Sequence, residues 1–321
     1  MQSPAPVPHT FRVHAILRFT AIAAAFAACA IACSPAPAPS WQSAVDQAAR
    51  SAPDARILVL DLATGRLLAS HHINDAAHTL SAPGSTLKPL ILYQLIANNR
   101  WNADRRIACN RKLVVAGHSL ACTHPSAPPF NAREALTWSC NTYFANVARI
   151  LQPGYLGRLL RPTGLLSITG LTNTSTPSES AAEFREPTSA ESTQLALLGV
   201  EGIRITPLEL AAAYRWLALQ LSAHPDSEAA HVVRAGITDS ASFGMARQAA
   251  RGGVSIAGKT GTAEGATASQ THGWFAGIAP AEKPAVVFVV YLPAGRGADA
   301  AGVAAPLLAH SPLAHASQRP Q

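Results

Sequence analysis

The sequence has few of the residues from which nucleic-acid interfaces are built. Aromatic residues make up 6% of the 321 residues, and the net charge of +7 includes no run of five basic residues. Because single-stranded nucleic acid is bound by aromatic side chains stacked beside basic ones, the composition argues against nucleic acid as a partner. The positive charge instead suits an anionic wall or membrane surface.

Cysteine is also scarce, with five in the chain: Cys29, Cys33, Cys109, Cys122 and Cys140. They form no Cys-x-x-Cys pair and no Cys/His set at a spacing typical of metal ligands, so the sequence predicts no metal site and no cofactor. Cys109 and Cys122 flank a short segment. In an oxidising compartment they would either close that segment with a disulfide or remain two free thiols.

The chain has one short apolar run, at residues 19–32, which is rich in alanine, uncharged and preceded by Arg12 and Arg18. Its length of about 14 residues matches the core of a signal peptide and falls short of the roughly 20 that a transmembrane helix needs. We therefore expect an exported protein, with residues 1–33 as a signal peptide or lipoprotein signal. The expected location is the periplasmic face of the cytoplasmic membrane of a bacterium.

Small residues precede Cys33 in Ala30-Ile31-Ala32-Cys33, which resembles a bacterial lipoprotein cleavage site. Lipid attached to Cys33 and an uncleaved short anchor are the two ways in which this segment would hold the protein at the membrane. Residues 34–40 alternate proline and alanine and are predicted to form an extended spacer. The folded domain is expected over residues 41–310, followed by a loose tail over 311–321.

Lysine is the rarer basic residue, with four lysines (Lys88, Lys112, Lys259 and Lys283) against 21 arginines. An arginine does not give up its proton in a protein, whereas a desolvated lysine can act as a base. Two of the four, Lys88 and Lys259, lie in short motifs that also contain hydroxyl groups. These two are therefore candidates for a chemical role.

Lys88 follows Ser85 by three residues in the stretch Pro83–Pro89. Residues three apart share one face of a helix, so a helix that opens near Ser85 would place Lys88 beneath the serine hydroxyl, with Gly84 allowing a tight entry. Pro89 is tolerated only near the first turn of that helix. Ser85 is therefore expected at the helix's N-terminal end, where free amides and the helix dipole stabilise a developing oxyanion.

Two further motifs carry hydroxyl, amide and amine groups. Ser139-Cys140-Asn141 is predicted to lie on an exposed turn, which offers a hydroxyl for proton relay and an amide for a substrate peptide group. Residues 259–262, Lys-Thr-Gly-Thr, lie in a predicted strand, where the lysine and the two threonine hydroxyls can bind a carboxylate. Gly261 would let a ligand backbone lie against that strand.

The remaining pattern predicts most of the regular structure. Helices are expected over residues 41–50, 87–96, 208–221 and 298–309, and one is expected to open with the capping box Asn131 and Glu134. Strands are expected over residues 56–60, 66–69, 254–262, 271–278 and 285–292. The Ser-, Thr- and Glu-rich residues 171–193 are predicted to form a long surface loop.

In this order, Ser-x-x-Lys, Ser-x-Asn and Lys-Thr-Gly resemble the three motifs of penicillin-binding proteins and serine β-lactamases. The wider sequence is similar to the transpeptidase domain of high-molecular-mass penicillin-binding proteins, over roughly residues 55–308. The similar stretches are residues 83–89, 134–144, 202–214, 258–263 and 272–280. The resemblance implies an α+β fold in which a five-stranded antiparallel sheet is packed with helices, plus an all-helical subdomain and an active site in the groove between.

The resemblance also implies an activity. Ser85 would attack the penultimate D-alanine of a peptidoglycan stem peptide, form an acyl-enzyme and pass the acyl group to the amine of a neighbouring stem. β-Lactam antibiotics would mimic the donor and trap the serine. The implied catalytic residues are Ser85, Lys88, Ser139 and Lys259; the implied substrate-binding residues are Asn141, Thr260, Gly261 and Thr262; and the amides of Ser85 and Thr262 would form the oxyanion hole.

Three alternatives stay open at this point. With water as the acceptor, the same enzyme would be a D,D-carboxypeptidase. A class D-like β-lactamase shares the first and third motifs, although Asn141 argues against it because those enzymes usually carry an apolar residue there. A non-catalytic β-lactam sensor would keep the pocket without turnover. Rapid hydrolysis of penicillin would indicate the β-lactamase, and acylation without any effect on stem peptides would indicate the sensor.

Overall fold

The computed structural model describes residues 1–2, 39–171, 179–264 and 270–316. Apart from Met1 and Gln2, the predicted signal segment with Cys33 lies outside the described residues, as do residues 34–38 of the predicted spacer. Within the described part of the chain, no helix is both long enough and apolar enough to cross a membrane.

Five strands form one antiparallel sheet in the order β2-β1-β9-β8-β7. Their bounds are β1 Arg56–Asp61, β2 Leu67–His71, β7 Ala257–Glu264, β8 Thr271–Ala279 and β9 Val286–Leu292. The sequence predicted all five. β7 differs most from its predicted range, since it begins at Ala257 and continues to Glu264. It forms one edge of the sheet and, within the described residues, pairs only with β8, in a register that sets Lys259 opposite Ala276.

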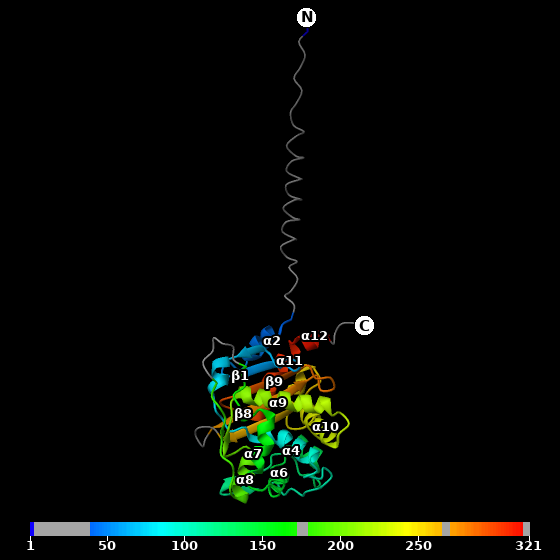
Figure 1. The fold of residues 1–321 in the computed structure, drawn as a ribbon. Coiled ribbons are helices and arrows are strands. Elements are labelled where there is room, and N and C mark those ends of the chain that lie inside the picture. Colours follow the sequence, from blue (N-terminus) through cyan, green and yellow to red (C-terminus); the bar gives the residue numbers. More distant parts are fainter. Residues whose placement is uncertain (3–38, 172–178, 265–269, 317–321) are drawn as a thin grey trace. The chain divides into compact units, whose positions relative to one another are not determined.

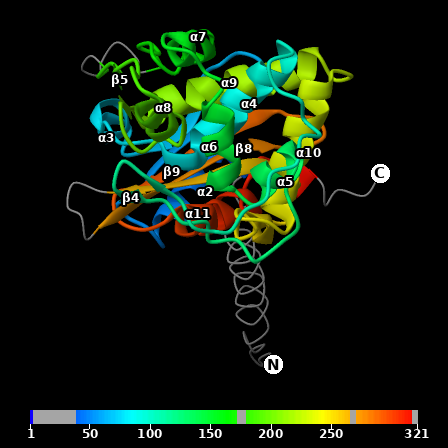
Figure 2. The ribbon, with the colours of Figure 1, turned by 90° about the horizontal axis from the view of Figure 1, so that it is seen from below.

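Helices cover both faces of this sheet (Figures 1 and 2). The strands alternate accordingly: Val287 and Val289 of β9 pack with the larger core, whereas Phe288 and Val290 pack with the smaller one. Helices α4 (Lys88–Ala97) and α9 (Pro207–Ala223) contribute to the larger core, and α2 (Trp41–Ala49) and α11 (Gly297–Ala309) to the smaller. Helix α4 is buried from Lys88 to Ile96, including its polar residues Lys88 and Gln94.

The helical part contains α5 (Ala132–Thr137), α6 (Asn141–Ala148), α7 (Tyr155–Leu160), α8 (Ala190–Leu197) and α10 (Glu228–Ser242), with α3 (Ile73–His78) beside the sheet. Two small hairpins pair β3 (Val114–Val115) with β4 (His118–Ser119) and β5 (Glu183–Phe184) with β6 (Ile203–Arg204). The 3-10 turns are η1 Gly84–Leu87, η2 Arg161–Thr163 and η3 Ala249–Gly252. The expected α+β class with a five-stranded antiparallel sheet is therefore confirmed.

Two regions differ from the sequence-based prediction. The segment predicted as a loop over 171–193 contains β5 and the start of α8, because Ser189 and Ser192 form a capping box that the Ser-rich composition concealed. Residues 172–178 lie outside the described part. Residues 312–316 of the predicted loose tail form helix α12 (Pro312–Ala316), and the buried Ser311 donates a hydrogen bond to the Leu308 carbonyl.

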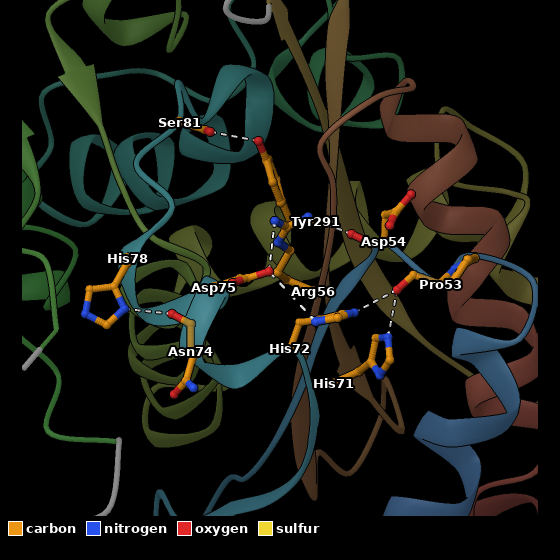
Figure 3. A network of polar contacts seen from close by, with 10 residues as sticks. All are labelled: Pro53, Asp54, Arg56, His71, His72, Asn74, Asp75, His78, Ser81 and Tyr291. Atoms are coloured by element: carbon orange, nitrogen blue, oxygen red, sulfur yellow. Dashed lines mark hydrogen bonds and ion pairs between the residues drawn. The ribbon is translucent and has the colours of Figure 1, made fainter. Parts of the chain in front are cut away.

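A polar network joins the start of β1 to the segment that leads into the Ser85 motif (Figure 3). Arg56 forms an ion pair of 3.1 Å with Asp75 of α3 and donates a 2.7 Å hydrogen bond to the Asp54 carbonyl. Its guanidinium lies 5.9 Å from the centre of the Tyr291 ring, and the Tyr291 hydroxyl is 2.8 Å from Ser81 Oγ. The sheet thereby holds the chain four residues before Ser85.

Candidate active site

The segment immediately before Ser85 is fixed to β8 and to the helical part. The Ala82 carbonyl accepts a 2.9 Å hydrogen bond from Trp274 Nε1, and His272 Nε2 lies 2.7 Å from the same oxygen. On the other side, the Gly84 amide donates a 2.9 Å hydrogen bond to the Gly199 carbonyl. His272 is thus a buried structural residue, and Ser85 is presented by backbone that is anchored on both sides.

Ser85 lies in the 3-10 turn η1, directly before α4 begins at Lys88. Pro89 falls in the first turn of α4, where it costs little, so Ser85 is at the N-terminal end of the helix as the sequence predicted. The side chain is half-buried, and its hydroxyl makes no hydrogen bond with the described residues. Gly84 has φ of +54°, and a Cβ there would lie 2.7 Å from the Thr262 carbonyl, so only glycine fits this approach to β7.

The third motif is packed against the Ser85 turn. A Cβ on Gly261 would lie 2.5 Å from the Pro83 carbonyl and 2.9 Å from Thr86 Cγ2, so the turn fills the space that Gly261 leaves. The sequence-based expectation had assigned that space to a ligand backbone. From the opposite side, the Tyr214 hydroxyl of α9 donates a 2.9 Å hydrogen bond to the Thr86 carbonyl. The nucleophile candidate is therefore held between an edge strand and a buried tyrosine.

Ser139 lies in the turn between α5 and α6, directly before Asn141 at the start of α6, and both residues are half-buried, whereas the sequence predicted an exposed turn. Ser139 has φ of +55°, a left-handed conformation that is uncommon and strained for a serine and is typical of functional sites. Asn141 is the first residue of α6, and its Nδ2 donates a 3.0 Å hydrogen bond to the Leu120 carbonyl. That contact fixes the amide so that its Oδ1 faces the amine of Lys88.

Lys88 is fully buried, and its amine contacts the second motif. Nζ donates to Asn141 Oδ1 at 2.6 Å, to the Ser139 carbonyl at 2.9 Å and to Ser139 Oγ at 3.3 Å. Among the described residues, no hydrogen bond joins this amine to the Ser85 hydroxyl, beneath which the sequence predicted it to lie. Burial lowers the pKa of Lys88 to about 8, an effect partly opposed by Cys140 and Cys122 nearby. A lysine with this pKa is neutral in about half of the molecules near pH 8 and in about a tenth near pH 7.

Lys259 is equally buried and reaches the same hydroxyl. Its Nζ donates to Ser139 Oγ at 2.8 Å and to the Thr260 carbonyl at 2.9 Å. Burial holds the pKa of Lys259 well below its usual range, and the charge on Lys88 lowers it further. Ser139 Oγ therefore lies between two desolvated amines, an arrangement through which a proton can pass from one side of the site to the other.

The two threonines of the third motif differ in their surroundings. Thr260 is buried, whereas Thr262 is exposed and its Oγ1 accepts a 2.9 Å hydrogen bond from the Gly297 amide at the start of α11. Because that contact uses a lone pair of the oxygen, the Thr262 hydroxyl hydrogen is still available to a ligand carboxylate.

A cavity of about 1210 Å³ opens between the sheet and the helical part. Glu264, His272 and Tyr291 line it from the sheet side, and His118 and Glu201 line it from the helical side. It reaches the segment before Ser85. The cavity lining includes Ser81 and Ala82 but none of the residues of the three motifs.

The structure brings three sequence motifs together around Ser139 Oγ, although residues 88, 139 and 259 are far apart in the chain. Sequence reasoning did not identify Tyr214 and Trp274 as supports of the Ser85 turn. Both lie in stretches that had been recognised as similar to the family, residues 202–214 and 272–280, so the signal was present without a role attached to it. A half-exposed serine with buried amines nearby can perform acyl transfer through a serine nucleophile.

Comparison with known proteins places this arrangement in context. The family model described as "Penicillin binding protein transpeptidase domain" matches residues 55–311. Among curated protein sequences, none matches the chain significantly. Three solved structures share 18–19% sequence identity with this chain, and at that level their similarity shows the fold alone.

The transpeptidase domain of penicillin-binding protein 3 from Burkholderia pseudomallei superposes with a TM-score of 0.72 at 19% identity, covering 89% of this chain and 99% of that one. PBP2 from Pseudomonas aeruginosa, in complex with WCK 5153, superposes with a TM-score of 0.70 at 19% identity, covering 88% of this chain and 77% of that one. A peptidoglycan glycosyltransferase from Burkholderia ambifaria superposes with a TM-score of 0.68 at 18% identity, covering 84% of this chain and 90% of that one.

Proposed function

The chain belongs to the penicillin-binding protein transpeptidase family, and on that basis we propose that it is a serine D,D-transpeptidase acting on the D-Ala-D-Ala ends of peptidoglycan stem peptides. The observation that carries the proposal is the hydroxyl of Ser139 between two buried amines, 2.8 Å from Lys259 Nζ and 3.3 Å from Lys88 Nζ, beside the turn that presents Ser85. Family membership also supports β-lactams as covalent ligands.

Acylation starts with proton transfer from the Ser85 hydroxyl. In its neutral form, the Lys88 amine has two N–H groups, which donate to its two nearest acceptors, Asn141 Oδ1 and the backbone carbonyl of Ser139. Its lone pair is then left to accept the proton of the Ser85 hydroxyl. Ser85 Oγ then bonds to the carbonyl carbon of the penultimate D-alanine. The backbone amides of Ser85 and Thr262 stabilise the resulting oxyanion, since both belong to the tightly packed junction of η1 and β7.

Collapse of the tetrahedral intermediate breaks the peptide bond and releases the terminal D-alanine. Its amine takes a proton from Ser139, which regains one from a neighbouring lysine through the contacts that join this hydroxyl to both amines. The hydroxyls of Thr260 and Thr262 bind the terminal carboxylate of the donor. The second Nδ2 hydrogen of Asn141 is left for a carbonyl of the stem peptide, because the first is bonded to Leu120.

An amine from a neighbouring stem peptide then attacks the acyl-enzyme and completes the cross-link, and attack by water instead would give a carboxypeptidase. Such a reaction takes place outside the cytoplasm. We therefore propose that residues 1–33 direct export and that the protein acts at the periplasmic face of the membrane, held by an N-terminal anchor or by lipid on Cys33.

A stem-peptide assay tests the proposal. Purified protein is incubated with an acylated peptide ending in D-Ala-D-Ala, with and without an amine acceptor, and the products are identified by mass spectrometry. We expect release of one D-alanine and a new amide to the acceptor, while a peptide ending in L-Ala-L-Ala stays intact. Hydrolysis alone would indicate a carboxypeptidase. An intact peptide together with rapid hydrolysis of penicillin would overturn the proposal in favour of a β-lactamase.

The rate of acylation is expected to rise with pH as Lys88 loses its proton. Because burial lowers the pKa of Lys88 to about 8, the neutral base is a minority below that pH and the rate should fall about tenfold per pH unit there. Above about pH 8 the rate should level off. Stopped-flow measurement of labelling by a fluorescent penicillin, at pH values on both sides of 8, gives the profile. A rate that is flat or declines with rising pH would exclude Lys88 as the base.

A further inference from the structure

Four side chains with metal-binding atoms meet beneath the Ser139–Asn141 turn. They are Cys109, Cys122 and His124 from the segment before α5, and Cys140 from the turn itself. One donor atom from each lies within 4.8 Å of all the others, and three of the four residues are buried. Cys122 and His124 are two residues apart, but Cys109 and Cys140 lie 13 and 18 residues from Cys122, and the sequence-based expectation of no metal site missed this cluster.

The distances between the sulfur atoms discriminate between two kinds of link. Cys122 Sγ lies 3.6 Å from Cys109 Sγ and 3.9 Å from Cys140 Sγ. A disulfide needs an S–S distance of about 2.05 Å. All three cysteines are free thiols in the structure, so of the two states that the sequence left open for Cys109 and Cys122 it has the free thiols and not the disulfide. Two thiolates bound to one tetrahedral zinc ion at about 2.3 Å lie about 3.8 Å apart, which is the spacing found here.

His124 supplies the fourth donor atom. The residue is 1% exposed, and its Nδ1 lies 2.7 Å from the Pro125 carbonyl, so Nδ1 carries the hydrogen and Nε2 carries the lone pair. Nε2 is buried and has no hydrogen-bond partner in the described part of the protein. A buried nitrogen is rarely left without a partner, and a histidine held at one nitrogen by a carbonyl is the usual metal-binding form.

Each sulfur also accepts a hydrogen bond from a backbone amide. The donors are Arg111 to Cys109 at 3.3 Å, Asn141 to Cys122 at 3.2 Å and Tyr143 to Cys140 at 3.5 Å. Amide hydrogens directed at sulfur stabilise the negative thiolate, which is the form that binds metal. The surroundings are therefore arranged for three thiolates and one neutral imidazole.

We propose that Cys109, Cys122, His124 and Cys140 bind one Zn²⁺ ion as a structural site. Thiolate and imidazole donors in a tetrahedral set of four favour zinc over the hard cations that prefer oxygen. All four positions are taken by protein atoms and no place is left for a reactive water, so the ion serves to hold the fold together.

The metal would hold the second motif in place. Cys122 Sγ accepts a hydrogen bond from the backbone amide of Asn141. The carbonyl of Leu120, two residues before Cys122, accepts a hydrogen bond from Asn141 Nδ2, so the segment around Cys122 contacts Asn141 twice. Asn141 Oδ1 in turn accepts a hydrogen bond from Lys88 Nζ. Fixing this segment to Cys140 therefore keeps the amide oriented toward the amine. This effect on catalysis rests on the proposed function, whereas the metal site does not.

The test is the metal content of the full chain, purified under reducing conditions, supplied with Zn²⁺ and then dialysed against a weak chelator. We expect inductively coupled plasma mass spectrometry to find about one zinc ion per chain in the wild type, and clearly less bound zinc in Cys122→Ser and His124→Ala. The matched control is His118→Ala, because His118 lies in the same segment but pairs with Glu201 at 2.7 Å. Replacing zinc with Co²⁺ should produce the visible absorption of a tetrahedral thiolate site.

Wild-type protein that retains no zinc and gives no such cobalt spectrum would overturn the proposal, as would a Cys109–Cys122 disulfide in folded, metal-free protein. Both measurements use the wild type, so they remain decisive if a variant fails to fold. Zinc retained by a chain that leaves stem peptides intact would count against the proposed enzyme activity and not against the metal site.

Discussion

Replacing Ser85 with alanine is expected to abolish covalent labelling by a fluorescent penicillin. The hydroxyl is the only atom of this side chain that can bond to the β-lactam carbonyl, so its loss should lower acylation by roughly 10⁴-fold or more, as removal of a serine nucleophile does elsewhere. The side chain is half-buried and its hydroxyl makes no hydrogen bond with the described residues, so the variant should fold normally. Gel fluorescence after a fixed incubation, with thermal unfolding of the same sample, measures both quantities.

The matched control for Ser85→Ala is Ser222→Ala, because among the described residues the Ser222 hydroxyl bonds only to the Ala218 carbonyl one turn earlier in α9. It should be labelled as fast as the wild type. Digestion of labelled wild type and mass spectrometry should locate the adduct on the peptide that contains Ser85. An alanine variant that still carries the label, or an adduct on another residue, would remove Ser85 from the mechanism.

Replacing Lys88 with methionine is the second large effect that we expect. Methionine fills the buried space of the lysine stem without an amine, so proton transfer from Ser85 loses its base and acylation should slow by about 10²- to 10⁴-fold. The pH dependence near 8 should disappear with it. The acylation rate and its pH profile are measured by stopped-flow labelling, as for the wild type.

The same change leaves two carbonyl oxygens, those of Asn141 and Ser139, without their donor. The variant should therefore be less stable by about 1–3 kcal/mol, and denaturant unfolding must show that it is folded at the assay temperature. Lys283→Met, at an exposed position, is the matched control and should change neither quantity. A folded Lys88→Met protein that is acylated at the wild-type rate would show that another group acts as the base.

The elements that the sequence predicted well are those whose signal is local. The strands β8 and β9 lie close to their predicted ranges, and Asn131 with Glu134 forms the capping box that predicted the start of α5. Ser85 was placed correctly because Pro89 restricts where a helix can start, whatever surrounds it. In each case a few neighbouring residues carry the physical cause.

The features that the sequence did not predict depend on distant segments. Lys88 Nζ points to Ser139 and Asn141 because the turn before α6 lies against the start of α4, a contact that residue spacing does not encode. Gly261 faces Pro83 because β7 packs against the turn that holds Ser85, a contact that residue spacing does not encode either. The four residues proposed to bind zinc are brought together only when the segment before α5 returns to Cys140.

The place of β7 at the end of the strand order bears on which ligands the protein tolerates. One side of β7 has no strand beside it in the described part of the chain, so an extended ligand backbone could pair with this edge. Main-chain pairing of this kind is indifferent to most side chains. If the proposed function holds, discrimination between ligands would then depend on the few groups at the ligand's terminus, and stem peptides of varied composition would be accepted alike.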